Sequence, residues 1–153
     1  MLLQSLTFDE LVMRGVNQCF ARILAAPRSY HQNLDIIVGQ TDWDYVVPVD
    51  VTDVVPLWDE NANSFVRWRR NGVTEFVWLF HDDKAWILIA KSEQGIMAKL
   101  WQNWVEFQDA DDEEACRFAN AIGFRCHVKG LQLLATGNDA FRKWILDLPD
   151  EKA

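Results

Sequence analysis

The alternation of apolar and polar residues is clearest between Val54 and Phe107, where its strongest feature is a hairpin. Asn71-Gly72 separates two strand-like runs, Ser64–Arg70 and Val73–Phe80, and both turn residues tolerate the positive φ of a type I′ turn. A two-residue loop fixes the register of the two strands. The expected pairs are Arg70 with Val73, Trp68 with Glu75, Val66 with Val77 and Ser64 with Leu79 on one face, and Arg69 with Thr74, Arg67 with Phe76 and Phe65 with Trp78 on the other.

A further strand and a helix follow the hairpin. Ala85–Lys91 has no polar residue between its ends, which predicts an internal strand with both faces covered. Ser92 is a suitable N-cap for a helix over Glu93–Phe107. The polar residues of this helix form one narrow stripe, so we expect the rest of its surface, Trp104 included, to be buried in a groove on the sheet.

The chain before this block predicts one long helix and several short strands. A capping box begins the helix at Thr7–Ala26, and Pro27 ends it. Compact apolar runs predict strands at Leu34–Gly39, Asp42–Val49 and Val51–Trp58. Prolines in the last two favour edge positions or bulges, and the order of these strands stays open.

The chain after this block predicts two helices and a small hairpin. The first helix spans Glu113–Ile122 and ends at Gly123. Phe124–Val128 and Leu131–Ala135 are expected to form the hairpin, and the last helix ends before Pro149. Together these elements predict an α+β fold: a mostly antiparallel sheet packed against an N-terminal helix, a central amphipathic helix and C-terminal helices.

Composition limits the class of protein. With 153 residues, half of them hydrophobic and eight of them Trp, the chain is expected to form a single domain over residues 1–153. A net charge of −8 argues against a nucleic-acid or anionic-membrane binder and permits a basic protein partner. The first residues lack the basic and continuous apolar regions of a signal peptide, and no run of about 18 apolar residues occurs, so we expect neither secretion nor membrane spanning. Three cysteines without C-x-x-C spacing favour reduced thiols and a cytoplasmic location.

Motifs for catalysis are lacking. The three histidines form no H-x-x-x-H pair, and no Gly-rich phosphate loop or G-x-S-x-G motif occurs. Cys126 and His127, placed on a strand, would point to opposite faces and could not form a dyad. His81-Asp82-Asp83 is more simply a solvated loop than a general base or a metal site. We therefore expect no catalytic residues, no metal and no cofactor, although the sequence leaves enzymatic activity open.

Two acidic segments are candidate partner-binding sites. Five carboxylates lie close together in the first, and their simplest role is to stabilise the start of the following helix. The alternative is contact with a basic partner, because clustered acids attract cations. The second segment adds an aromatic side chain that could anchor an interface. The residues are Asp109, Asp111, Asp112, Glu113 and Glu114 in the first, and Asp42, Trp43 and Asp44 in the second.

A family resemblance covers about a third of the chain, residues 53–107. The run D-V-V-P-L-W-D-E-N-A-N-S-F-V-R-W, a turn, E-F-V-W-L-F-H-D-D, then W-I-L-I-A-K-S and an amphipathic helix resembles the central block of the SMI1/KNR4 superfamily, also called SUKH. The family's Leu-Pro segment and glycine-rich turn are not visible before Asp42, and the tail from Phe124 does not align. The resemblance implies an α+β domain that binds proteins without catalysis; many bacterial members are immunity proteins against toxins, often nucleases.

Three hypotheses about function follow from the sequence. The first is a protein-binding module of immunity type with a basic partner. The second is a small-molecule-binding or enzymatic domain with a pocket between the 93–107 helix and one face of the sheet. The third is a subunit of a homo-oligomer that uses the same face as its interface. That face carries Arg67, Arg69, Phe76 and Trp78.

Overall fold

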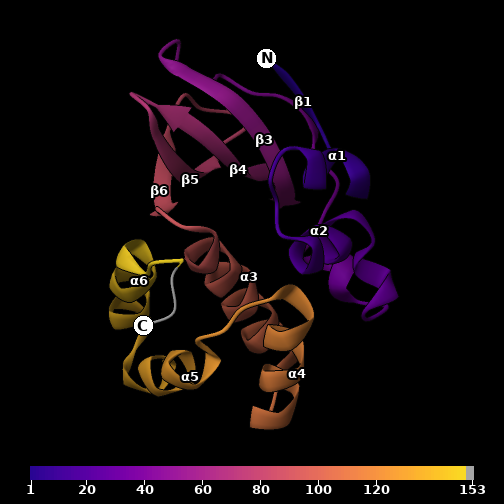
Figure 1. Cartoon of the computed structure of the whole chain (residues 1–153), viewed down its shortest axis with the longest axis vertical. Coiled ribbons are helices and arrows are strands. Elements are labelled where there is room, and N and C mark those ends of the chain that lie inside the picture. Colours follow the sequence, from indigo (N-terminus) through magenta and orange to yellow (C-terminus); the bar gives the residue numbers. More distant parts are fainter. Residues whose placement is uncertain (151–153) are drawn as a thin grey trace.

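A four-stranded antiparallel sheet lies towards one end of the long axis of the protein in a computed structural model that describes residues 1–150 (Figure 1). The sequence also predicts that Asp150–Ala153 fray; residues 151–153 lie outside the described residues. The strand order follows the chain: β3 (Val51–Glu60), β4 (Asn63–Arg70), β5 (Val73–Leu79) and β6 (Trp86–Ala90). Two short strands, β1 (Leu2–Gln4) and β2 (Asp42–Asp44), form a separate antiparallel ribbon.

Helices flank the sheet and extend the molecule beyond one end of it (Figure 1). With two antiparallel sheets and these helices, the predicted α+β class is confirmed. Among residues 1–150, every helix falls short of the length and apolarity needed to cross a membrane. The helices are α1 (Phe8–Met13), α2 (Gln18–Ala25), α3 (Glu93–Gln108), α4 (Asp112–Ile122), α5 (His127–Thr136) and α6 (Asn138–Asp147), with 3₁₀ turns at Pro27–Ser29 and Leu34–Ile36.

The hairpin between β4 and β5 has the predicted turn and the predicted register. Asn71 and Gly72 have φ values of 54° and 75°, as a type I′ turn requires. All seven predicted cross-strand pairs, from Arg70 with Val73 to Ser64 with Leu79, are present. The local turn chemistry alone was therefore enough to place every side chain of this hairpin on its correct face.

The prediction that Ala85–Lys91 is an internal strand is wrong. β6 pairs only with β5 and forms an edge of the sheet, with Ile87 46% exposed. Both of its faces are nevertheless partly covered, because Trp86 and Leu88 pack against one hydrophobic cluster and Ile89 against the other. The strand is therefore apolar because side chains pack on both of its faces. It does not have a hydrogen-bonded strand on each side.

The single helix predicted at Thr7–Ala26 is divided into α1 and α2. Gly15 adopts a φ of +86° and breaks the helix. Asn17 then caps α2, its side chain accepting hydrogen bonds from the backbone N–H groups of Cys19 and Phe20. The predicted start is confirmed, because Thr7 accepts a hydrogen bond from the N–H of Glu10.

Three short apolar runs do not form the strands that the sequence predicts. Leu34–Gly39 contains a 3₁₀ turn in place of a strand; Leu34, Ile37 and Val38 are buried, whereas Ile36 is exposed. Phe124–Val128 and Leu131–Ala135 are not a hairpin, since most of this segment is helix α5. Gly130 lies inside α5, where an added Cβ would be 2.8 Å from the ring of Trp101. The glycine permits close packing of α5 on that ring and does not mark a turn.

The other elements differ from the predictions mainly in length. The strand predicted at Asp42–Val49 ends at Asp44, whereas the one predicted at Val51–Trp58 continues to Glu60. Pro56 of this edge strand adjoins a register shift in its pairing with β4, as a proline in an edge strand should. The helix predicted at Glu113–Ile122 is present as α4, and Gly123 ends it with a φ of +84°.

Hydrophobic clusters cover both faces of the sheet. The larger one lies between the sheet and the helices, and α3 runs through it with Trp101 and Trp104 fully buried. The face with the two arginines is therefore covered more fully than the sequence indicates, because Phe65 and Phe76 belong to this cluster. The smaller cluster, on the opposite face, consists of Leu3, Tyr45, Val66, Trp68, Val77 and Leu79.

Candidate functional site

The exposed side chain of Trp43 is at the centre of the first candidate site. β2 places Trp43 opposite Leu3 of β1, at the margin of the smaller cluster. Its indole is 45% exposed and lies against the imidazole of His81, with ring centroids 5.2 Å apart. A large aromatic side chain that keeps much of its surface in water is a common anchor for a protein partner.

Carboxylates from two distant segments flank this tryptophan. Asp42 and Asp44 precede and follow Trp43, and Asp82 and Asp83 come directly after His81. All four are exposed, as are Lys84 in the same loop and the Met1 amine, which lies 2.8 Å from Asp44. We call Asp42, Trp43, Asp44, His81, Asp82 and Asp83 the Trp43 surface. The sequence indicated the two segments separately, but no sequence signal showed that they meet.

Buried hydrogen bonds on either side of β2 hold Trp43 in place. Thr41 donates to the Asp59 carboxylate at 2.9 Å, and the single hydroxyl hydrogen of Tyr45 is shared between the Ala62 carbonyl at 2.8 Å and the Asp59 carboxylate at 3.2 Å. Burial raises the pKa of Asp59, although these donors act in the opposite direction. No pattern in the sequence indicated this network, which fixes the position of β2 on the sheet.

The second acidic segment, residues 109–114, is mostly engaged within the protein. Glu114 accepts hydrogen bonds from Tyr30 and Trp104 and pairs with Arg117. Asp111 is the N-cap of α4, accepting a hydrogen bond from the N–H of Glu114 at 2.8 Å. Asp109 ends α3 in the left-handed conformation, with a φ of 49°. These roles favour the interpretation that the run shapes the junction between α3 and α4.

The remaining acids of this segment, Asp112 and Glu113, are exposed in the first turn of α4. They do not form one surface with Trp43. Figure 1 shows β1, which pairs with β2, near one end of the long axis of the molecule and α4 towards the other. The two acidic segments are therefore separate candidates for a partner site.

A charged pocket of about 410 Å³ lies where the sequence-based alternative placed one, between the start of α3 and the sheet. Its charged lining includes Arg67 and Arg69 of β4, Asp53 of β3 and Glu93 of α3. Burial raises the pKa of Glu93 and lowers that of Arg67, so neither charge is fully solvated. Phe76 lines the pocket too, but Trp78 stacks on Phe65 in the core, 5.4 Å between ring centroids.

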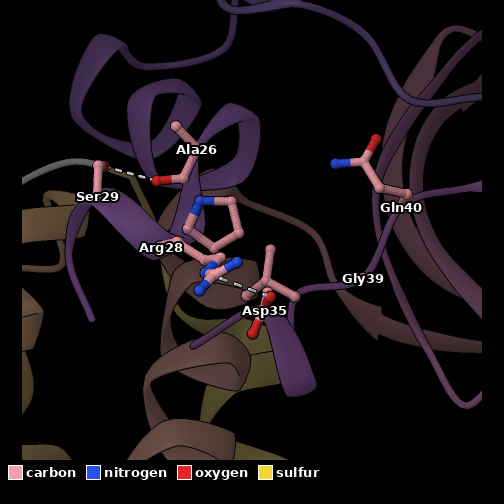
Figure 2. Close-up of a pocket in the computed structure, with 8 residues that line it drawn as sticks. Ala26, Arg28, Ser29, Asp35, Gly39 and Gln40 are labelled. Atoms are coloured by element: carbon pink, nitrogen blue, oxygen red, sulfur yellow. Dashed lines mark hydrogen bonds and ion pairs between the residues drawn. The ribbon is translucent and has the colours of Figure 1, made fainter. Parts of the chain in front are cut away.

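A hollow of about 370 Å³ lies between the turn after α2 and the segment that leads to β2 (Figure 2). Figure 2 shows Arg28 and Asp35 side by side, and their charged groups are 3.8 Å apart. Ser29 donates a hydrogen bond to the Ala26 carbonyl at 2.6 Å. Arg28 and Asp35 thus bind each other and Ser29 binds the backbone, so the hollow is a weaker candidate than the charged pocket.

The structure also changes the basis for the expectation about Cys126 and His127. These residues lie at the start of α5 and not on a strand, so the argument from opposite strand faces does not apply. Within residues 1–150, no hydrogen bond joins the two, and Nδ1 of His127 is buried without a partner. The same residues hold no group of three or more His, Cys, Asp or Glu side chains that could bind a metal ion.

Comparisons of the chain with protein-family models, curated proteins and solved structures found no match.

Proposed function

We propose that this protein is a non-catalytic binding module that docks a basic protein partner on the Trp43 surface. The observation that carries the proposal is the contact between Trp43 and His81, which joins an exposed aromatic side chain to four flanking aspartates. A desolvated tryptophan supplies affinity at the centre of an interface, and peripheral carboxylates attract a cationic partner and speed its approach. The net charge of −8 acts in the same direction.

The finer proposal is that the partner is a toxin with a basic surface, such as a nuclease, and that binding neutralises it. This part rests on the resemblance of residues 53–107 to the SMI1/KNR4 block and on the acidic character of the Trp43 surface. A nuclease needs a cationic surface to hold its substrate, so it is complementary to clustered aspartates.

The test compares four forms of the purified protein as bait in a lysate of the native host, with the captured proteins identified by mass spectrometry. They are the wild type, Trp43→Ala, the charge variant D42N/D82N and a matched control, D112N/E113Q. Both double variants remove two exposed carboxylates, from the Trp43 surface and from α4 respectively. Circular dichroism establishes that each form is folded.

We expect the wild type and D112N/E113Q to capture the same basic protein, Trp43→Ala to lose it, and D42N/D82N to capture less of it at low salt. Loss of the captured protein with D112N/E113Q alone would show that the interface lies on α4. Equal capture by all four folded forms would overturn the proposal. If the captured protein is a nuclease, inhibition of its activity by the wild type and not by Trp43→Ala tests the finer proposal.

A further inference from the structure

The charged pocket is built around an irregularity in β3. The pairing of β3 with β4 shifts register between Thr52 and Val55, and Asp53 within this bulge has a φ of +53°. A residue other than glycine is strained in this conformation, and such strain is concentrated at functional positions. The bulge brings the Asp53 carboxylate to 2.5 Å from Arg14 and 3.9 Å from Arg67.

Arg67 is held in the pocket from both sides. Its guanidinium also donates a hydrogen bond to the Arg14 carbonyl, in the turn between α1 and α2, and its side chain is only 13% exposed. Arg69 lies two residues further along β4 and therefore on the same face. Thr74, the cross-strand partner of Arg69, adds a hydroxyl group to the pocket lining.

The charged side chains that line the pocket differ in how many of their hydrogen-bonding positions are already occupied. Each carboxylate of the lining already has a donor: Asp53 has Arg14, Glu93 has the N–H of Asn17 at 3.0 Å, and Asp150 has the N–H of Gln94 at 2.9 Å. A guanidinium has five N–H donors. Within residues 1–150, Arg67 and Arg69 each donate one hydrogen bond, the latter to the Gly72 carbonyl. The hydrogen-bonding positions that stay unoccupied in the pocket are therefore mainly N–H donors of Arg67 and Arg69.

We propose that this pocket binds a small anion that carries a carboxylate or phosphate group, held by the guanidinium groups of Arg67 and Arg69 and by the Thr74 hydroxyl. A guanidinium presents its N–H groups in a fixed fork that matches both kinds of oxyanion. Lys91 lines the same pocket too, but its ammonium is paired with Asp147 at 3.6 Å, so the two arginines supply the main positive charge. A volume of about 410 Å³ is sufficient for a metabolite-sized ligand.

This site is separate from the proposed docking surface. The pocket adjoins the Asn71-Gly72 turn, whereas His81 and its partner Asn63 lie at the opposite ends of β5 and β4. Six residues of extended strand between Asn63 and Arg69 correspond to about 20 Å. A ligand in the pocket and a partner on the Trp43 surface can therefore be tested independently.

The test measures binding of two probes, inorganic phosphate and succinate, by isothermal titration calorimetry and by the midpoint of thermal unfolding. Sodium chloride at matched ionic strength controls for general salt effects. The variants are Arg69→Gln and Thr74→Val in the pocket. Arg142→Gln is the matched control, because it removes an exposed guanidinium from α6, and its ion pair with Asp139 is exposed too.

We expect at least one probe to bind the wild type and Arg142→Gln. The affinity should fall by about tenfold or more in Arg69→Gln, as for loss of a charge-assisted hydrogen bond. Thr74→Val removes only a neutral donor and should cause a smaller loss; it also serves if Arg69→Gln does not fold. Phosphate binding alone would assign a tetrahedral oxyanion, and succinate binding alone a carboxylate. Absence of binding by both probes, or equal affinity in all folded variants, would overturn the proposal.

Discussion

The indole of Trp43 and the imidazole of His81 lie 5.2 Å apart between ring centroids, although 38 positions separate the two residues in the chain. This contact joins the middle of the β1–β2 ribbon to the loop between β5 and β6. Asn63 fixes that loop, since its side chain accepts a hydrogen bond from the backbone N–H of His81 at 3.2 Å. The exposed tryptophan thus lies against an anchored support and does not project from a free loop.

Removing charge from the Trp43 surface should slow association with a basic partner. Peripheral charges act mainly on the association rate constant and are screened by salt, so D42N/D82N should reduce this constant by about tenfold at low ionic strength. The dissociation rate constant should change little. Surface plasmon resonance at two salt concentrations gives both constants, and D112N/E113Q measures the contribution of the acids on α4. An unchanged association rate for D42N/D82N at low salt would rule out steering by these carboxylates.

Trp104→Ala should reduce the free energy of unfolding by about 3 to 5 kcal/mol, as truncation of a large buried aromatic does. Trp104 is fully buried between α3 and its neighbours. Trp43→Ala is the control, because a half-exposed tryptophan should cost less than about 1.5 kcal/mol. Urea titration measures both. A loss below 1 kcal/mol for Trp104→Ala would contradict its place in the core.

The acidic residues of the segment 109–114 should contribute unequally to the stability of the protein. Asp111→Ala removes the N-cap of α4 and should cost about 1 kcal/mol. Asp112→Asn and Glu113→Gln, at exposed positions, should each change stability by less than about 0.5 kcal/mol. Thermal unfolding of the three single variants tests this. Similarly small losses of thermal stability in all three variants would show that α4 does not depend on its N-cap.

The Glu75 carboxylate should make stability depend on pH in the acidic range. Burial opposes its ionisation, but hydrogen bonds from Arg70 and Trp68 outweigh that effect and hold the pKa of Glu75 below its ordinary value of 4.5. A carboxyl group with a lowered pKa in the folded state stabilises above the unfolded pKa and loses that contribution as pH falls through the folded pKa. The wild type should therefore exceed Glu75→Gln in stability by more at pH 7 than at pH 3, measured by urea titration. Asp35→Asn, at an exposed site, is the control.

Gly95→Ala should destabilise the protein, although alanine is the better helix former by about 1 kcal/mol. Gly95 lies in α3, where an added Cβ would be 2.6 Å from the Cβ of Ala90 and 2.7 Å from the carbonyl oxygen of Ile145. Overpacking against backbone typically costs about 1 to 3 kcal/mol. Gln132→Ala, at an exposed position of α5, controls for helix propensity. Greater thermal stability of Gly95→Ala would show that α3 and α6 can separate without cost.

The parts of the fold that local chemistry specifies could be predicted from the sequence. Asn71-Gly72 set a whole register, and Ser92 and Gly123 marked the ends of helices correctly. Short apolar runs were harder, because a buried helical turn and a buried strand have the same composition. Leu131–Ala135 illustrates this ambiguity, since its leucines pack against the larger cluster from helix α5, in which Gly130 lies against Trp101 and Phe141.

The candidate sites depended even more on contacts between distant segments. The sequence indicated Trp43 and its two aspartates, but the approach of His81 follows from how the ribbon lies on the sheet. It also indicated Arg67 and Arg69 on one face, whereas Asp53 joined them through a bulge and a strained φ that no residue pattern marks. The sequence could therefore predict which residues belong to the candidate sites, but not which residues from distant segments contact them.

The attachment of the β1–β2 ribbon has a consequence for amide hydrogen exchange. From this ribbon and the residue after it, Leu3 and Tyr45 are the side chains buried in the smaller cluster, whereas β4 and β5 are held between both clusters. The ribbon should consequently open at a lower free energy than the sheet, and the amides of Leu3 and Tyr45 should exchange before that of Val66. A partner that binds Trp43 only when the ribbon is closed would suppress this opening, and its apparent affinity would scale with the closed fraction.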